Sequence, residues 1–167
     1  MTILGIDPGE TVTGFGVVEK SGSRLSLVAS GCIRIPRTHG TDAERLNELH
    51  RSIAALIEKH RPNVAAVEKL FFATNAKTAM RVAQGRGVAL AACAERCLAV
   101  LEFTPLQIKQ AVTGYGRAEK RQVQKMVGTI LGLAGPLLED DAADAVAAAI
   151  CASTHSELRA LTRTPGQ

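Results

Sequence analysis

The chain has 167 residues, of which 46% are hydrophobic and only 3% aromatic. This length and composition suffice for one domain around an aliphatic core, which excludes a disordered protein. The chain holds no run of about 18 apolar residues, which excludes a membrane-spanning helix. It opens without a basic leader or a cleavable apolar segment, so we expect a cytoplasmic protein.

The net charge of +4 is unevenly distributed along the chain. Residues 69–130 carry 10 basic and 3 acidic side chains, whereas residues 1–68 are balanced and residues 131–167 carry an acidic excess. A basic middle with few interleaved acids predicts a polyanionic partner such as nucleic acid. A solvated helix face is the alternative explanation for such a charge run.

Hydrophobic periodicity and turn signals predict the elements in chain order. The first half should hold three strands, a helix and a fourth strand, at residues 3–7, 13–20, 24–35, 41–60 and 64–68. The second half should hold a helix, a fifth strand and three helices, at residues 75–97, 99–103, 105–113, 118–131 and 139–152. This order predicts an α/β fold in which helices pack on a five-stranded mixed sheet. We expect residues 1–157 to form the single domain and residues 158–167 a frayed tail.

Local signals support several of these boundaries. Thr41 and Glu44 form a capping box at the start of a helix with one apolar face, and Pro105 suits the first turn of another helix. Close turns should join the first three strands into an antiparallel meander. The helix after the third strand is the crossover that would let the first and fourth strands lie parallel and side by side.

Four glycines stand where they weaken the element that holds them. Gly14 and Gly16 lie inside the second strand, where glycine often marks the close approach of a ligand or another backbone. Gly85 and Gly87 lie inside a helix, where each costs on the order of 1 kcal/mol relative to alanine. Close helix approach, within the domain or across a dimer, is a physical reason to keep them.

Two of the predicted strands end on acids. Asp7 ends the first strand and Glu68 the fourth, so parallel pairing would bring both carboxylates to one edge of the sheet. Asp141 and Asp144 are spaced i, i+3 at the start of the last helix and therefore share a face. Three of these acids also have an ordinary explanation, because Asp before Pro-Gly suits a turn at Asp7, and acids such as Asp141 and Asp144 favour helix N-termini.

The four acids together predict a chemistry that none of them predicts alone. Carboxylates gathered within a few ångströms repel one another unless they bind protons or hard cations. Mg²⁺ prefers a few carboxylates together with water and phosphate oxygens. Two ions about 4 Å apart can activate a water and stabilise the leaving oxygen of a phosphodiester. With a polyanionic partner, the four acids predict a nuclease.

A series of motifs runs in order over roughly residues 3–150. They are Gly5-Ile6-Asp7-Pro8-Gly9, Thr13-Gly14, Glu68 with Phe71 and Asn75, Gln84-Gly85-Arg86-Gly87, Lys109-Gln110, Ala118-Glu119-Lys120 and Asp141-Ala142-Ala143-Asp144-Ala145. Together they resemble the RuvC family of Holliday-junction resolvases. Each motif is weak by itself, but the ordered set is specific and spans nearly the whole chain.

The resemblance implies a ribonuclease-H-like fold and a Mg²⁺-dependent endonuclease of recombination and repair. Such an enzyme resolves four-way DNA junctions by symmetric paired nicks that leave ligatable 5′-phosphate ends. Asp7, Glu68, Asp141 and Asp144 would be the catalytic acids and would hold two Mg²⁺ ions per subunit, with Mn²⁺ able to substitute. The resemblance also implies a homodimer that acts with junction-binding and branch-migration motor proteins.

Further positions take a role in DNA binding from the same resemblance. Phe71 would contact unpaired bases near the crossover, where base–aromatic stacking is worth about 1–3 kcal/mol. Lys109 and Lys120 would face the DNA, and Lys120 could stabilise the charge that develops on the scissile phosphate. Arg117 and Arg121 would bind phosphates.

The resemblance gives the mid-helix glycines a role, but this chain also differs from the usual family sequence at some positions. Gly85 and Gly87 would lie in the dimer contact. Lys69 stands where an uncharged polar residue is more usual, so phosphate contacts beside Glu68 can differ. Some members carry His at the third acid, where this chain has Asp141.

Three other functions compete with a junction resolvase. An opening Gly-Ile-Asp with a glycine-rich hairpin is also typical of actin-like sugar kinases and chaperone ATPases, but 167 residues leave no room for their second domain. An inactive junction-binding module would keep the scaffold without the chemistry. A related ribonuclease-H-like nuclease would act on another substrate, such as RNA in a hybrid.

Overall fold

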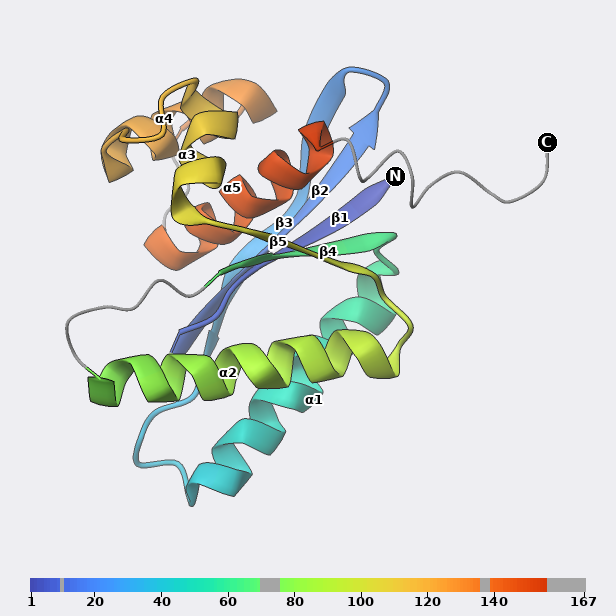
Figure 1. Cartoon of the computed structure of the whole chain (residues 1–167). Coiled ribbons are helices and arrows are strands. Elements are labelled where there is room, and N and C mark those ends of the chain that lie inside the picture. Colours follow the sequence, from blue (N-terminus) through green and yellow to red (C-terminus); the bar gives the residue numbers. More distant parts are fainter. Residues whose placement is uncertain (10, 70–75, 136–138, 156–167) are drawn as a thin grey trace.

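The computed structural model describes residues 1–9, 11–69, 76–135 and 139–155, and its centre is one five-stranded sheet (Figure 1). The strands are β1 Thr2–Asp7, β2 Val12–Ser21, β3 Arg24–Arg34, β4 Val64–Glu68 and β5 Val100–Phe103. Their order in the sheet is β3-β2-β1-β4-β5. The pairs β1–β2 and β2–β3 are antiparallel, whereas β1–β4 and β4–β5 are parallel. The predicted meander and the predicted mixed sheet are both confirmed.

Helices cover both faces of this sheet. They are α1 Asp42–His60, α2 Ala76–Glu95, α3 Pro105–Thr113, α4 Lys120–Leu131 and α5 Asp140–Thr154. In Figure 1, α1 and α2 lie on one face, and α3, α4 and α5 lie on the other. Each face therefore has its own aliphatic core, one around Ile53 and Val67 and the other around Ile108 and Val146. Among the described residues, no helix has the length and apolarity needed to cross a bilayer.

The helix starts follow the capping chemistry of the sequence. Thr41 accepts a hydrogen bond from the backbone of Glu44, whose side chain in turn accepts one from the Thr41 backbone. Thr104 forms the same box with Gln107 in front of Pro105. The helix predicted at residues 75–97 ends earlier, at Glu95, and Cys97 then takes a positive φ of 52°. The tail predicted at residues 158–167 lies outside the described residues.

Candidate active site

The two strand-end acids meet at one edge of the sheet. In the parallel pairing of β1 with β4, Ile6 lies opposite Val67. Asp7 and Glu68 follow directly, each as the last residue of its strand. The predicted convergence of these carboxylates is therefore built into the register of two central strands, whose apolar residues are almost fully buried.

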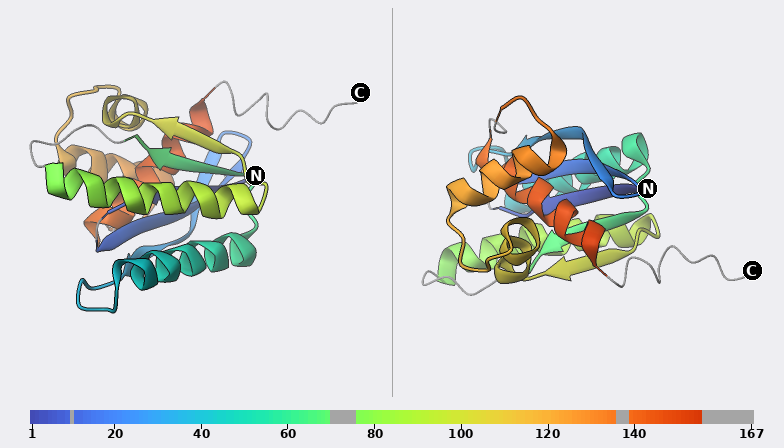
Figure 2. Two further views of the ribbon diagram at one scale, coloured as in Figure 1. Left: turned by 60° about the horizontal axis from the view of Figure 1, so that its bottom comes forward. Right: turned by 90° about the horizontal axis from the view of Figure 1, so that it is seen from above.

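Helix α5 lies close against the sheet (Figure 2) and carries the other two acids, whose charges both act on Asp7. Gly14, which pairs with Asp7 across β1 and β2, lies under the first turn of α5. A Cβ at Gly14 would collide with the carbonyl oxygen of Asp141, and a Cβ at Gly5 would collide with that of Ala145. A Cβ at Gly16 would also be too close to Val146, whose backbone Cα and N would lie 2.9 Å from it. The strand glycines thus permit a backbone approach, as predicted for Gly14 and Gly16, and they seat the helix that carries Asp141 and Asp144.

The charges of the four acids act on one another. Burial raises the pKa of Asp7 to about 7, and the negative charges of Glu68, Asp144 and Asp141 contribute to this rise, against a lowering by Lys120. Burial also raises the pKa of Glu68, with Asp144 adding to the rise and two lysines opposing it. A pKa near neutrality in a largely buried carboxyl means that the acids lack compensating positive charge. Added positive charge at this edge would be favourable.

Two lysines lie beside the acids. A pocket of about 180 Å³ is lined by Glu68, Lys109, Lys120 and Asp144, with apolar residues of α3, α4 and α5 completing its wall. The Lys120 Nζ lies 3.0 Å from Asp144 Oδ2. Desolvation lowers the pKa of Lys120, but its hydrogen bond to Asp144 and the nearby negative charges outweigh this and raise that pKa. Lys120 therefore stays charged at neutral pH.

The donors at this edge are of the kind that a hard divalent cation takes. Asp7, Glu68, Asp141 and Asp144 offer only carboxylate oxygens, as Mg²⁺ prefers. In the part of the chain that the structure describes, no three His, Cys, Asp or Glu side chains are already gathered as a metal cluster. The carboxylates are near enough to perturb one another electrostatically, and Lys120 supplies part of the positive charge. The donor set fits the ion in chemistry, and binding would need the side chains to draw together.

The remaining predicted site residues differ in where the structure places them. Arg117 and Arg121 lie just before and within the first turn of α4, and both are exposed. Phe71 lies outside the described residues. Gly87 has open space where a Cβ would stand. Gly85 instead is buried in its own domain, where a Cβ would come 3.1 Å from the carbonyl oxygen of Gly9. Gly85 thus packs against the turn after β1. This contact explains the glycine without the predicted dimer contact.

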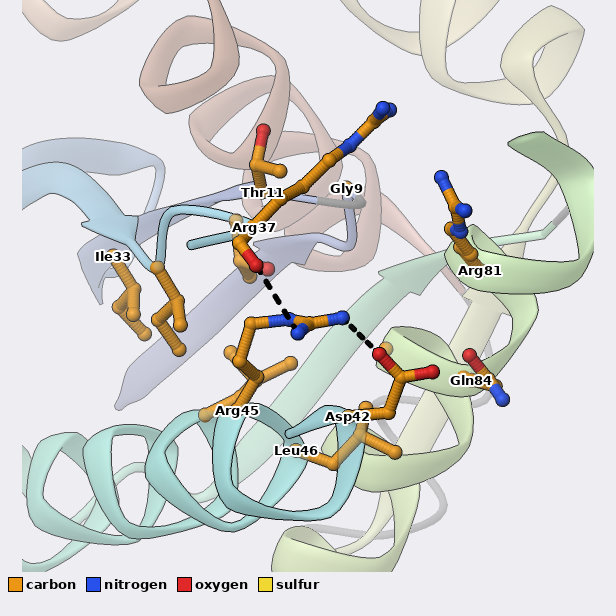
Figure 3. A pocket seen from close by; sticks show the side chains of 13 residues that line it. Gly9, Thr11, Ile33, Arg37, Asp42, Arg45, Leu46, Arg81 and Gln84 are labelled. Carbon is orange, nitrogen blue, oxygen red and sulfur yellow. Dashed lines mark hydrogen bonds and ion pairs between the residues drawn. The ribbon is translucent and has the colours of Figure 1, made fainter. Parts of the chain in front are cut away.

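Figure 3 shows a second, smaller pocket of about 40 Å³ between that turn, the β3–α1 connection and α2. Its floor is organised by Arg45, which pairs with Asp42 and donates to the carbonyl oxygens of Arg37 and Gly40, at 3.3 Å each. These contacts tie the connection to the start of α1. The four acids do not line this pocket.

One residue at the site was missed in the sequence. Asp140, next to Asp141, has the pattern of an ordinary acid at a helix start, but its carboxylate contacts α4. Gln124 Nε2 donates to Asp140 Oδ1 at 2.7 Å, and Lys120 Nζ lies 3.4 Å from Asp140 Oδ2. Gln124 follows Lys120 by one helical turn, which is the only signal in the sequence that the two share a face.

Comparisons with known proteins show which family the chain matches. The model of the family described as crossover junction endodeoxyribonuclease RuvC matches residues 3–152. The crossover junction endodeoxyribonuclease RuvC of Pelotomaculum thermopropionicum is 51% identical over 156 residues, which cover 93% of this chain and 94% of that protein. Its counterpart from Rubrobacter xylanophilus is 50% identical over 160 residues, or 96% and 89% of the two chains.

Solved structures give the same result. The structure of Thermus thermophilus RuvC superposes with a TM-score of 0.86 at 32% identity, covering 95% of this chain and 97% of that one. The T. thermophilus RuvC in complex with a Holliday junction substrate superposes with a TM-score of 0.85 at 30% identity, covering 95% and 96%. The fold and nearly the whole length are therefore shared with these proteins.

Proposed function

The chain belongs to the RuvC family of crossover junction endodeoxyribonucleases, and we propose that it resolves four-way DNA junctions by symmetric paired nicks in recombination and repair. The observation that carries this proposal is the match over residues 3–152 together with the four acids at one edge of the sheet. The products would be ligatable 5′-phosphate ends. The family fold extends over the whole described chain, which disfavours an actin-like kinase.

The four acids are the proposed catalytic centre. Asp7, Glu68, Asp141 and Asp144 would hold two Mg²⁺ ions per subunit, with Mn²⁺ able to substitute. When bound, the ions would activate a water and stabilise the leaving oxygen of the phosphodiester. The raised pKa of Asp7 supports this assignment, because a bound cation would offset the burial and the repulsion that together favour the protonated carboxyl. Asp7 ends β1, the central strand of the sheet.

Lys120 and Lys109 are the proposed cationic groups of the site. The Lys120 ammonium lies against Asp144 at 3.0 Å, in the pocket that also contains Glu68. A scissile phosphate near these acids would be within reach of this ammonium, whose fixed positive charge favours the charge that develops during cleavage. Lys109 lines the same pocket and would bind a neighbouring phosphate.

The remaining substrate contacts extend from this centre. Phe71 would stack on an unpaired base near the crossover, and Arg117 and Arg121 would bind phosphates. We also propose a homodimer, since two symmetric nicks need two centres, with Gly87 in its interface. Junction-binding and branch-migration motor proteins would act with it in the cytoplasm. Sedimentation of a monomer alone at micromolar concentration would contradict the dimer.

A cleavage assay with matched substrates tests the function. A synthetic four-way junction, a linear duplex of the same arm sequence and an RNA–DNA hybrid are incubated with the protein and Mg²⁺. We expect paired nicks at symmetric positions in the junction and an uncut duplex and hybrid. Cleavage of the hybrid would identify a ribonuclease, and tight junction binding without cleavage would identify an inactive module. Equal cleavage of the linear duplex would contradict a resolvase.

A further inference from the structure

The carboxylate of Asp140 uses both of its oxygens to contact α4. Oδ1 accepts a hydrogen bond from Gln124 Nε2 at 2.7 Å, and Oδ2 pairs with Lys120 Nζ at 3.4 Å. Asp140 thus connects the first turn of α5 to the first turn of α4, directly beside the four acids.

Lys120 lies between two carboxylates that differ in their surroundings. It pairs with Asp144 at 3.0 Å and with Asp140 at 3.4 Å, and the side chains of Asp144 and Asp140 are 31% and 68% exposed. Asp144 faces the other acids, whereas Asp140 faces solvent and Gln124. Of these two partners, Asp144 is the one whose charge acts on Asp7. One partner of Lys120 thus belongs to the proposed metal site, and the other does not.

This arrangement matters once the carboxylate of Asp144 binds a cation. The pairing of Asp144 with Lys120 would then weaken, because a bound cation neutralises the carboxylate and repels the ammonium. Lysine has a flexible four-carbon side chain and is 47% exposed here, so without a second partner it would move away into solvent. Asp140 remains available as that partner, and Gln124 fixes the orientation of its carboxylate.

We propose that Asp140 is a positioning residue that keeps Lys120 at the catalytic acids when Asp144 is engaged, with Gln124 orienting the Asp140 carboxylate. The inference rests on the proposed function of the same site. It assigns to Asp140 an effect on cleavage that passes through Lys120. An acid in the first turn of a helix can also act only on the helix dipole, and such an effect would not depend on Lys120.

A double-mutant cycle separates these two roles. The rate constant for cleavage of pre-bound four-way junction is measured in Mg²⁺ for the wild type, Asp140→Asn, Lys120→Ala and the double variant. Asparagine keeps the shape and still accepts the Gln124 hydrogen bond, but it removes the charge that pairs with Lys120. We expect Asp140→Asn to slow cleavage about two- to fivefold, as suits a partly exposed pair, with unchanged junction affinity. In the Lys120→Ala background, Asp140→Asn should have almost no effect.

Two further variants complete the cycle. Asp140→Glu should recover part of the rate, and Gln124→Ala should slow cleavage less than Asp140→Asn, because it leaves the carboxylate in place. Asp42→Asn is the matched control, since Asp42 also pairs with a basic side chain in the first turn of a helix but lies away from the acids. Equal slowing by Asp140→Asn with and without Lys120, or a wild-type rate for Asp140→Asn, would overturn the inference. A wild type that does not cut junctions would instead overturn the proposed function.

A second readout does not depend on cleavage. In Asp140→Asn, Lys120 would pair with Asp144 alone and compete more strongly with a cation there. The Mg²⁺ concentration that gives half of the metal-induced rise in melting temperature should therefore increase about two- to fivefold. In the double variant, this Mg²⁺ concentration should equal that of Lys120→Ala. An unchanged Mg²⁺ midpoint in Asp140→Asn would contradict the shared pairing of Lys120.

Discussion

Replacing Asp7 with asparagine should stabilise the metal-free protein at pH 8. Burial and the charges of Glu68, Asp144 and Asp141 raise the pKa of Asp7 from 3.8 to about 7. Ionising this group in the folded protein therefore lowers the free energy of unfolding. The interval between the two pKa values corresponds to at most about 4 kcal/mol, and relaxation of the chain reduces it. Asparagine keeps the shape of the side chain and removes the charge.

The sign of the effect fixes its pH dependence. The folded state binds the Asp7 proton more tightly than the unfolded state, so the stability of the wild type falls as the pH rises from about 4 to about 7. Above about pH 7, this loss of stability is complete. The advantage of Asp7→Asn should therefore be absent near pH 4, grow through pH 5 and 6, and be full at pH 8.

Urea and thermal unfolding in the presence of a chelator measure this effect. For a domain of this size, 2–3 kcal/mol corresponds to a rise in melting temperature of about 5–10 °C. Glu19→Gln, which changes an exposed acid opposite Thr2 at the other end of β1 from Asp7, serves as the control and should shift the melting temperature little. Mg²⁺ should then stabilise the wild type more than Asp7→Asn. A variant equal to or less stable than the wild type at pH 8 would refute the crowding of negative charge at this edge.

Three further predictions follow from individual contacts. Gly14→Ala should lower the free energy of unfolding by about 1–3 kcal/mol in urea titrations, because its methyl group meets a backbone carbonyl that cannot rotate away. It should also slow junction cleavage by about 100-fold through displacement of α5, and a wild-type rate would contradict this. Arg86→Ala should cost about 1–3 kcal/mol in the same titrations, because it leaves the half-buried Glu102 without its ion-pair partner; Glu102→Gln added to it should recover part of the loss. Replacing Arg117 and Arg121 with alanine should reduce the slope of log affinity against log salt by about 0.9 for each phosphate that the variant no longer binds, with little change in the cleavage rate at saturation. An unchanged slope would show that these arginines do not bind phosphates.

Much of the fold could be predicted because its signals are local. Alternating and helical periodicity, the capping box at Thr41 and the Pro105 helix start each depend on neighbouring residues. The meeting of Asp7 and Glu68 also followed from local signals, because a helical crossover between two apolar strands favours parallel neighbours. The pairing of the strands through Ile6 and Val67 bears this out.

Features that depend on contacts between distant segments could not be read from the sequence in the same way. Gly85 has a helical position that suits a dimer contact equally well, and only the packing of α2 against Gly9 assigns it to the domain interior. Gly5 lies inside a strand as Gly14 and Gly16 do, but only the packed structure shows that the backbone lying against it is that of α5. Asp140 looked like a helix-start acid because its partners lie 16 and 20 positions earlier, on another helix.

The most direct test of the proposed catalytic centre is the single-turnover nicking of a four-way junction in Mg²⁺ by the wild type and by Asp144→Asn. Junction affinity is measured in parallel without metal. The four-acid centre predicts that Asp144→Asn binds the junction as the wild type does and nicks it at least about 100-fold more slowly. A wild-type nicking rate for Asp144→Asn would contradict it.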